Sequence, residues 1–365
     1  MKRGFLNGAK AKRESQLRDE SDSMVHTTIG DDEQVSECFF HHGTKEAFMK
    51  IPNFPEPLQV TTPAFRMVDI PGKGAGLVSI RELKMGDLIL NERPLFVAAE
   101  ELCLAIPPKG EKYFEASLDR MRPEAKTAFM ALCNCHKAEE NAGGALVGLG
   151  PLLGIVNTNG VSLSLPAAAD PWPQGGQTRP YSAVCENISR LNHSCSPNTV
   201  PQFHAASFSW RLYAARDITA GEELTRQYVS IQHPAAERQA ALKQIYDFVC
   251  ACPACTDPSI SDPRRATIAA FAATHHGKQE SSVVGFSSLD NDRFAECRTQ
   301  AELIESEGLQ HLPVYSTVLK LLIEASVVRM ELSSACQLAR KLDKCRWVDD
   351  RDAYQDHPLW RALVG

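Results

Sequence analysis

The stretch Arg190-Leu191-Asn192-His193-Ser194-Cys195-Ser196-Pro197-Asn198 is the most informative part of this chain for its fold. It follows a strand-like segment and is dense in polar and turn-forming residues. A catalytic Ser–His or Cys–His pair is one interpretation, but adjacent residues do not generally face each other as such a pair requires. A short polar loop that presents amide, imidazole and backbone groups to a ligand fits the pattern better.

Short strands separated by glycine turns lie on both sides of this stretch. Residues 81–87 have a counterpart in residues 216–222, and each predicts a strand, a tight turn at glycine and a second strand. Two copies are too few for a repeat solenoid. We therefore expect two halves of one irregular β-fold.

Helical periodicity occurs in two other regions. Residues from about 112 to 134 place five apolar side chains on one face, namely Phe114, Leu118, Met121, Ala125 and Phe129. Beyond residue 258, apolar residues recur at helical spacing with a break at Pro313, which predicts a small antiparallel helical lobe. Residues 166–180, rich in Pro and Gly and containing Trp172, predict a long surface loop.

Composition excludes several classes of protein. The 365 residues are 43% hydrophobic and 23% charged, which rules out wholesale disorder and a membrane bundle. The formal net charge of -6 disfavours nucleic-acid binding by counterion release. The first residues are charged rather than apolar, so we expect no secretory signal and reduced thiols. Residues 1–58 show no persistent period and predict a poorly ordered lead-in.

Three of the 12 cysteines stand together in Cys250-Ala251-Cys252-Pro253-Ala254-Cys255. Three thiols this close can wrap one tetrahedral zinc ion, but a closed structural site needs a fourth ligand. Cys185 and Cys195 are both candidates for it. The weaker cluster Cys133-Asn134-Cys135-His136 has no second pair at zinc-finger spacing, and we interpret it as structural.

The order of these motifs resembles a known family. Gly74-Ala75-Gly76, Asn192-His193-Ser194-Cys195, Gly221-Glu222-Glu223-Leu224-Thr225 with Tyr228, and Phe248 before the three cysteines look like a SET-domain protein-lysine methyltransferase. The arrangement is most similar to the SET-and-MYND-like branch common in fungi, without the MYND finger. The resemblance covers residues from about 63 to 256.

The resemblance implies a fold and a set of site residues. The fold is α+β: an irregular β-rich SET domain with a knot-like crossing, a helical insert, a zinc-binding post-SET segment and a C-terminal α-helical lobe. S-adenosylmethionine would be bound by Lys73, Gly74, Gly76, Asn159, Ser189, Asn192, His193, Tyr228 and Phe248, with Tyr228 also the catalytic tyrosine. One structural zinc would be held by Cys195, Cys250, Cys252 and Cys255.

The same resemblance sets the expected domains and partners. We expect a lead-in at 1–58, a SET domain at 59–230 with a helical insert at about 105–140, a post-SET zinc segment at 231–257 and a helical lobe at 258–365. The implied function is methyl transfer to a lysine of a protein substrate, histone or non-histone, and the alternative is a catalytically silent scaffold. We expect a monomer in the nucleus or cytoplasm, with no membrane partner and no direct nucleic-acid binding.

Three positions depart from the family pattern. Arg226 and Gln227 stand where the family usually has small or apolar residues, and Ser230 stands where an acidic residue is common. These departures concern the alignment of the substrate more than the binding of the cofactor.

Overall fold

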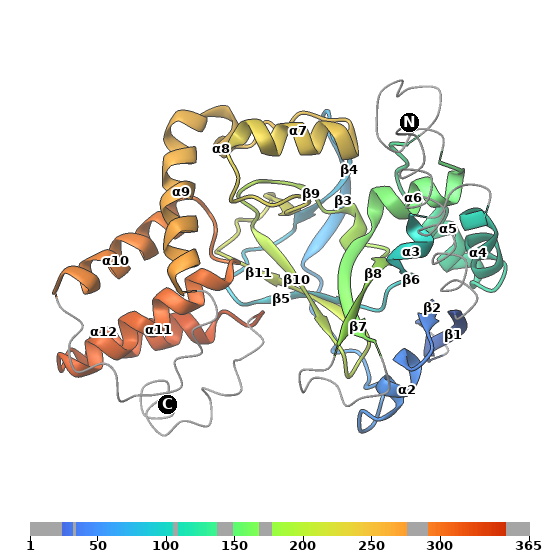
Figure 1. The fold of residues 1–365 in the computed structure, drawn as a ribbon, viewed down its shortest axis with the longest axis horizontal. Coiled ribbons are helices and arrows are strands. Elements are labelled where there is room, and N and C mark those ends of the chain that lie inside the picture. The colour runs from blue at the N-terminus through green and yellow to red at the C-terminus, as the bar shows by residue number, and fades with distance from the viewer. Residues whose placement is uncertain are drawn as a thin grey trace, which may run out of the picture.

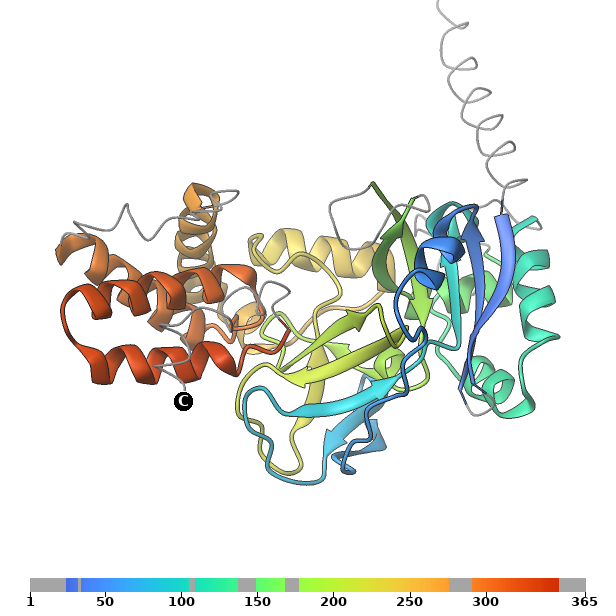
Figure 2. The same ribbon diagram turned by 90° about the horizontal axis from the view of Figure 1, so that it is seen from below.

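The computed structural model describes residues 24–31, 34–104, 109–136, 149–167, 177–275 and 291–347. Within these ranges it confirms the α+β class. The helices α9 to α12 lie at one end of the molecule, the sheets in the middle, and β1, β2 and α3 to α6 at the other end (Figures 1 and 2). In the described part of the chain no helix is long and apolar enough to cross a membrane.

The sheet that carries the informative stretch has the strand order β3 (Phe65–Ile70), β4 (Gly74–Ser79), β12 (Glu223–Arg226) and β9 (Asn192–His193). The first three strands pair antiparallel, whereas β12 and β9 pair parallel. Parallel neighbours cannot be joined by a tight hairpin. The chain must therefore travel away and return before β12 can lie beside β9.

Two further sheets complete the β-structure of the described residues. One has the order β10 (Thr199–His204), β11 (Ser209–Ala214) and β5 (Leu88–Glu92), all antiparallel. The other has the order β1 (Met24–Gly30), β2 (Val35–His41), β6 (Phe96–Ala99), β8 (Thr178–Val184) and β7 (Val161–Pro166). The predicted loop at 166–180 connects β7 to β8, and its residues 168–176, with Trp172, lie outside the described residues.

The two similar segments, residues 81–87 and 216–222, lie side by side in the structure. Leu83 and Ile218 form an isolated antiparallel bridge, in which each backbone N–H donates to the other carbonyl at 2.9 Å. Leu83 and Ile218 are both fully buried. The two segments are therefore paired elements of one β-fold, as their similarity indicated.

The prediction of a poorly ordered lead-in is wrong for residues 24–31 and 34–58, and residues 1–23 lie outside the described residues. β1 and β2 pair along their whole length, and helix α2 (Thr44–Met49) follows. β2 also pairs parallel with β6, so Cys38 and Phe40 are completely buried. Burial of the apolar side chains of β2 stabilises these strands. The charged residues around them hid the strand pattern in the sequence.

The helical insert is two helices rather than one. Helix α4 (Lys109–Leu118) ends before α5 (Pro123–Met130), because Pro123 occupies the first turn of α5 and cannot continue a preceding helix. The apolar residues of both helices enter one core with α3 (Glu100–Cys103) and α6 (Pro151–Asn159). The ends of the predicted insert, 105–108 and 137–140, lie outside the described residues.

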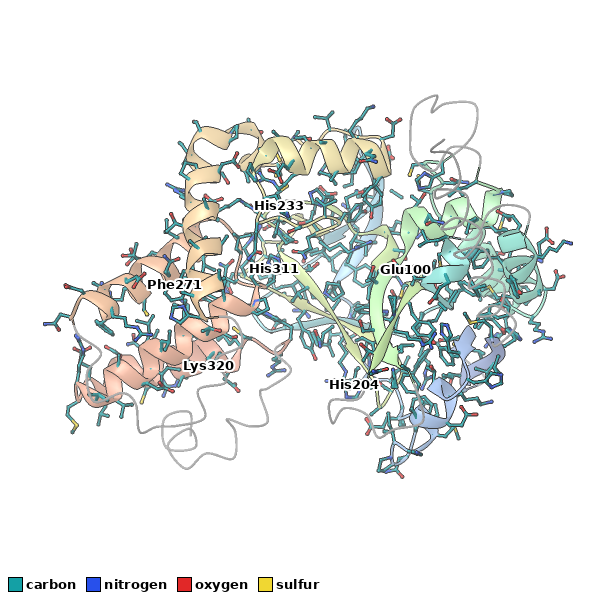
Figure 3. The ribbon with its side chains drawn as sticks, in the orientation of Figure 1. Glu100, His204, His233, Phe271, His311 and Lys320 are labelled. Carbon is teal, nitrogen blue, oxygen red and sulfur yellow. The ribbon has the colours of Figure 1, made fainter. Side chains whose placement is uncertain are left out.

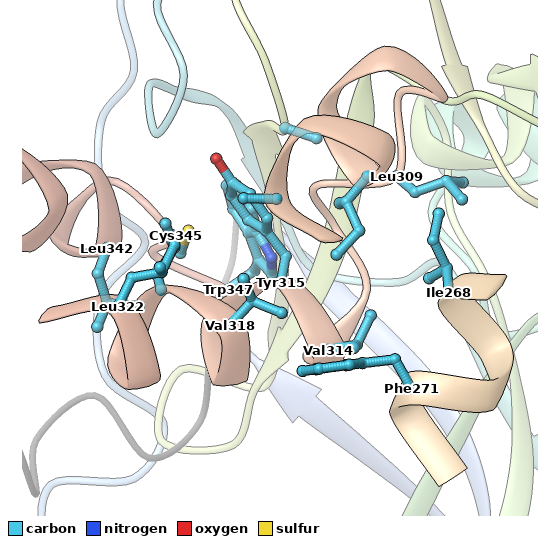
Figure 4. Packing of buried hydrophobic residues seen from close by; sticks show 14 of the residues in the cluster. Ile268, Phe271, Leu309, Val314, Tyr315, Val318, Leu322, Leu342, Cys345 and Trp347 are labelled. Carbon is cyan, nitrogen blue, oxygen red and sulfur yellow. The ribbon is translucent and has the colours of Figure 1, made fainter. Parts of the chain in front are cut away.

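The predicted C-terminal lobe is helical, with the break at Pro313 as expected. It consists of α9 (Pro258–His275), α10 (Asn291–Ser306), α11 (Pro313–Val328) and α12 (Leu332–Asp343), while 276–290 and 348–365 lie outside the described residues. Its core contains Tyr315, Val318, Leu322 and Trp347 (Figure 4). The same cluster includes Cys195 and Tyr213, so lobe and β-fold share one core.

Candidate functional site

The parallel pair β9–β12 builds the site. Thr225 lies beside Asn192, and Arg226 lies beside His193. The Ser194 N–H donates to the Arg226 carbonyl at 3.0 Å, which extends the pairing beyond β9. The informative stretch and the Tyr228 segment are thus held against each other.

Residues 190–198 run beside residues 223–228, and this place is called the crossing. His193 is its central buried residue. Its Nδ1 accepts a hydrogen bond from the Tyr228 backbone N–H at 3.0 Å, and its Nε2 lies 3.3 Å from Cys195 Sγ. Burial, and then the charge of Arg226 among smaller contributions, lowers the pKa of His193 to about 4. The ring is therefore neutral at pH 7 and, with Nδ1 accepting, carries its proton on Nε2.

Aromatic rings surround His193. The Tyr228 ring centroid lies 5.4 Å from that of His193 and 4.9 Å from that of Tyr246, and the Phe248 ring lies 6.1 Å from His193. The Tyr228 hydroxyl donates to the Leu191 carbonyl at 2.7 Å. Burial raises the pKa of Tyr228 to about 12, so this phenol is protonated at neutral pH.

Tyr246 is a member of this cluster that sequence reasoning missed. It is the last residue of α7 (Ala235–Tyr246), and Asp247 caps that helix with a φ of 57°. This left-handed residue turns the chain so that Tyr246 and Phe248 both contact Tyr228. The Tyr246-Asp247-Phe248 spacing just before the cysteines was the available signal.

The glycine turn between β3 and β4 lies over the same crossing. Lys73 Nζ binds Glu223 Oε2 at 2.6 Å, and Asn192 Nδ2 donates to Glu223 Oε1 at 3.0 Å. A Cβ on Gly76 would lie 2.8 Å from Asn192 Nδ2, so only glycine allows this close approach. Glu223, which sequence reasoning did not single out, therefore links the turn to Asn192.

Asn159 and Ser189 lie beside the crossing with their polar side-chain atoms engaged by protein. Asn159 Nδ2 donates to the Cys133 carbonyl at 2.6 Å and to the Ile155 carbonyl at 2.7 Å. Ser189 Oγ donates to the Asn159 carbonyl at 2.9 Å. Both residues fix the short helical turn η1 (Ile188–Arg190) that leads into Asn192.

Four thiols converge next to His193. The sulfur atoms of Cys195, Cys250, Cys252 and Cys255 all lie within 4.8 Å of one another, and Cys195 Sγ is 3.5 Å from Cys255 Sγ. Sulfurs bound tetrahedrally at about 2.3 Å lie about 3.8 Å apart, so the set fits zinc. Cys185, the other candidate ligand, is fully buried but is not in this group.

Arg238 lies against the thiols. Its side chain is fully buried, and its Nη2 donates to the Ala254 carbonyl at 3.1 Å and to Cys255 Sγ at 3.6 Å. Hydrogen bonds from Cys195 and Cys250, with a smaller contribution from Arg238, lower the pKa of Cys255 to about 6. A guanidinium in this position offsets part of the negative charge of a thiolate set.

The weaker cluster at 133–136 has a packing role in the structure. Cys135 Sγ lies 3.3 Å from Thr158 Oγ1 on α6 and 3.8 Å from the Ile245 carbonyl on α7. Among the described residues, the cluster contributes no member to a group of potential metal ligands. It joins the helical insert to the segment that carries Tyr246.

The helical lobe contacts both sides of the crossing. Arg265 Nη1 donates to the carbonyls of Cys195 at 2.9 Å and Ile231 at 2.8 Å. His311, which lies where the lobe meets the sheets (Figure 3), bonds through Nε2 to Gln227 Oε1 at 2.8 Å. Sequence reasoning missed both residues, since nothing local marks a lobe residue as a partner of a distant loop.

Comparison with known proteins gives these elements a family. Residues 74–229 match the family model described as the SET domain. The chain is 28% identical over 218 residues to histone-lysine N-methyltransferase set5 of Schizosaccharomyces pombe, covering 58% of each chain. It is 32% identical over 75 residues to human N-lysine methyltransferase SMYD2, covering 20% of this chain and 17% of that one.

The aligned part thus spans little more than half of the fission-yeast relative and less of the human one. Among solved structures, the SET domain of LSMT bound to MeLysine and AdoHcy aligns with 85% of this chain and 86% of its own. The identity is 14% and the TM-score 0.35, too low to support a structural argument. The family match rests on the sequence of residues 74–229, which contain the crossing, and this part of the chain is a SET domain.

Proposed function

We propose that this protein transfers a methyl group from S-adenosylmethionine to the side-chain amine of a lysine in another protein. The observation that carries the proposal is the assembly of Asn192, His193, Tyr228 and Phe248 around one parallel strand pair within the SET domain. The relatives named above are histone-lysine or N-lysine methyltransferases, which supports the same chemistry.

Residues on the surface of the crossing would hold the cofactor. Gly76 lies close to Asn192, and Lys73 binds Glu223, which also accepts a hydrogen bond from Asn192; Phe248 lies near His193. The cofactor supplies a methyl group on a sulfonium, which is an electrophile. Asn159 and Ser189 would contribute mainly by fixing the loop, since Asn159 Nδ2 and Ser189 Oγ already donate to backbone carbonyls.

Zinc would be structural. All four predicted ligands are thiols and their sulfurs lie within 4.8 Å, so a tetrahedral ion would have no open position for substrate. The ion would tie Cys195, which follows β9, to the segment that follows Phe248. Phe248 would then be held beside His193 in the position that completes the cofactor pocket.

The aromatic cluster suits a lysine that must react as a neutral amine. Methyl transfer needs the nitrogen lone pair, whereas a free lysine has a pKa of about 10.4. Rings of Tyr228 and Tyr246 provide apolar walls that disfavour the ammonium ion, and the Tyr228 hydroxyl is a fixed dipole beside them. Catalysis would rest on positioning and electrostatics rather than on a protein nucleophile.

Two measurements test the proposal. Calorimetry should show binding of S-adenosylmethionine to the full chain, and radiolabelled methyl transfer should be detected on core histones or on a cell lysate. Tyr228→Phe should reduce transfer about 100-fold or more through lost positioning, with little change in cofactor affinity. Tyr113→Phe, which removes a hydroxyl from the helical insert, is the matched control. Cofactor binding without transfer to any protein would contradict the proposal.

The substrate class remains open between histone and non-histone proteins. A net charge of -6 favours encounter with basic proteins such as histone tails, but it acts on association rather than on the site. We propose a monomer that acts in the nucleus or the cytoplasm without binding nucleic acid. Comparing methyl-lysine across the proteome with and without this protein would identify the substrate.

One observation favours the alternative of a silent scaffold. Arg226 places a buried cation against Tyr228, where a substrate ammonium would otherwise be attracted. A scaffold would act through another surface, such as the exposed apolar tip of the lobe formed by Val328, Met330 and Leu332. Polar substitutions at this tip that abolish a cellular phenotype, with Tyr228→Phe harmless, would favour the scaffold.

A further inference from the structure

Arg226 is a buried cation that lies beside the aromatic cluster. Arg226 is 6% exposed, and its guanidinium carbon lies 4.4 Å from the centroid of the Tyr228 ring. Nη1 donates to the Gln227 carbonyl at 3.3 Å, while Nε is buried without a hydrogen-bond partner. Among the described residues no carboxylate forms an ion pair with Arg226.

Burying the Arg226 charge in this way lowers the stability of the fold. Burying a guanidinium without an ionic partner is unfavourable, and the contact with the Tyr228 face returns only part of that free energy. A small or apolar side chain at this position would avoid the cost. The charge is therefore a feature of this chain that its fold does not require.

The field of Arg226 reaches the rings that would surround the substrate. Burial raises the pKa values of Tyr228 and Tyr246, and the charge of Arg226 opposes that rise at both hydroxyls. The titratable and charged groups around these rings, besides Arg226, are Tyr228, Tyr246, His193, Cys133, Cys135, Glu223, Lys73, Arg238 and Cys252. Glu223 is the carboxylate among them, and it already binds Lys73. Arg226 is the cation that lies on the face of the Tyr228 ring.

We propose that Arg226 determines which form of the substrate side chain this site accepts, admitting a lysine as its neutral amine and excluding the ammonium ion. The inference rests on the proposed function and adds a specificity-determining residue to it. An ammonium ion against Tyr228 would share the ring with a second cation, whereas a neutral amine would not be repelled. Without Arg226, cation–π attraction to the ring faces would offset part of the desolvation cost that disfavours the ammonium ion.

The consequence for the reaction is that the proton leaves before the methyl group arrives. The ammonium loses its proton to water, and the amine nitrogen then forms the new C–N bond. The C–S bond of the sulfonium breaks in the same step, and its electron pair stays on sulfur. Arg226 takes no part in bond making, and it acts by removing the unreactive protonated state from the bound population.

A binding experiment tests Arg226 without requiring catalysis. The probe is n-butylamine, titrated calorimetrically into the full chain with S-adenosylhomocysteine present, for wild type, Arg226→Met, Arg226→Lys and the exposed control Arg66→Met. Wild type should bind about 100-fold more tightly at pH 9 than at pH 7, following the neutral fraction of the amine. Arg226→Met should bind at pH 7 at least tenfold more tightly than wild type, and Arg226→Lys and Arg66→Met should resemble wild type. Equal titrations of wild type and Arg226→Met at pH 7, including no binding by either, overturn the inference.

Methyl transfer to core histones gives the second readout. At pH 7, Arg226→Met should lower KM and kcat together, because it stabilises the unreactive ammonium complex. The acid limb of the pH profile of kcat reports the apparent pKa of the bound substrate amine. In Arg226→Met this apparent pKa should rise by about one pH unit. An unmoved limb overturns the inference. If wild type binds cofactor yet methylates nothing, the proposed function fails, while the butylamine titrations still decide the role of Arg226.

Discussion

Replacing Arg265 by methionine should destabilise the crossing from the side of the lobe. The Arg265 side chain is 1% exposed and binds the carbonyls of Cys195 and Ile231, Ser196 Oγ at 3.0 Å and Glu307 Oε2 at 3.1 Å. Methionine keeps the length of the stem but removes the charge. The Glu307 carboxylate, 5% exposed, would then lose its buried cation.

The expected cost follows from the burial of this pair. Removing one partner of a buried ion pair costs about 3–5 kcal/mol when the other charge stays buried and uncompensated, and here the exposed Arg264 would compensate Glu307 only in part. Arg264→Met is the matched control on the same helix, since Arg264 Nη1 also contacts Glu307, at 3.4 Å, but is 43% exposed. Loss of an exposed pair costs about 1 kcal/mol or less.

Urea unfolding of the full chain measures both variants, and transfer of zinc to a chelator reports the Cys195 side of the network. Arg265→Met should lower the free energy of unfolding by at least about 2 kcal/mol more than Arg264→Met, and should release zinc faster. Adding Glu307→Gln to Arg265→Met should recover part of the loss, because it removes a buried charge that the exposed Arg264 compensates only in part. Arg265→Met and Arg264→Met of equal stability would refute the argument.

Three more predictions concern the thiols, the glycine turn and the lobe. Cys252→Ser should weaken zinc and cofactor binding together, whereas Cys336→Ser, outside the thiol group, should weaken neither, as paired zinc and cofactor titrations will show. Gly76→Ala should lower cofactor affinity about tenfold, because its Cβ would lie 2.6 Å from Ile70 Cγ1, and unchanged calorimetric affinity would contradict this. Burial lowers the pKa of His311 from 6.5 to about 3, so protonation favours the unfolded state. Stability should fall by up to about 1.4 kcal/mol per unit as pH drops from 6.5 towards 3, and urea midpoints should show a shallower fall for His311→Gln than for the exposed His233→Gln.

Local signals in the sequence predicted the parts of the fold that local chemistry determines. The three thiols at Cys250, Cys252 and Cys255 lie within one short turn, and their proximity follows from spacing alone. Helical periodicity located the lobe helices because each buries one face. The similarity of residues 81–87 and 216–222 correctly indicated one β-fold, since both are strand edges around a glycine turn.

Long-range pairing explains what the sequence did not reveal. β2 is ordered because it inserts between β1 and β6, and no residue near Cys38 announces that partner. From the residues alone, the choice between Cys185 and Cys195 as the fourth thiol stayed open, because both are buried cysteines near the crossing. Arg265 and His311 read as ordinary helix and loop residues until the lobe places them against Cys195 and Gln227.

The hydrogen bonds from Arg265 and His311 of the lobe to the crossing have a consequence for the order in which the chain folds during synthesis. When the ribosome has released the chain only as far as Thr256, β9, β12 and all four thiols are present. The carbonyls of Cys195 and Ile231 and the side chain of Gln227 still lack the lobe partners, which arrive with Arg265 and His311. At that length the crossing lacks these three hydrogen bonds. Arg265 follows with α9, and His311, the last of the partners, lies between α10 and α11.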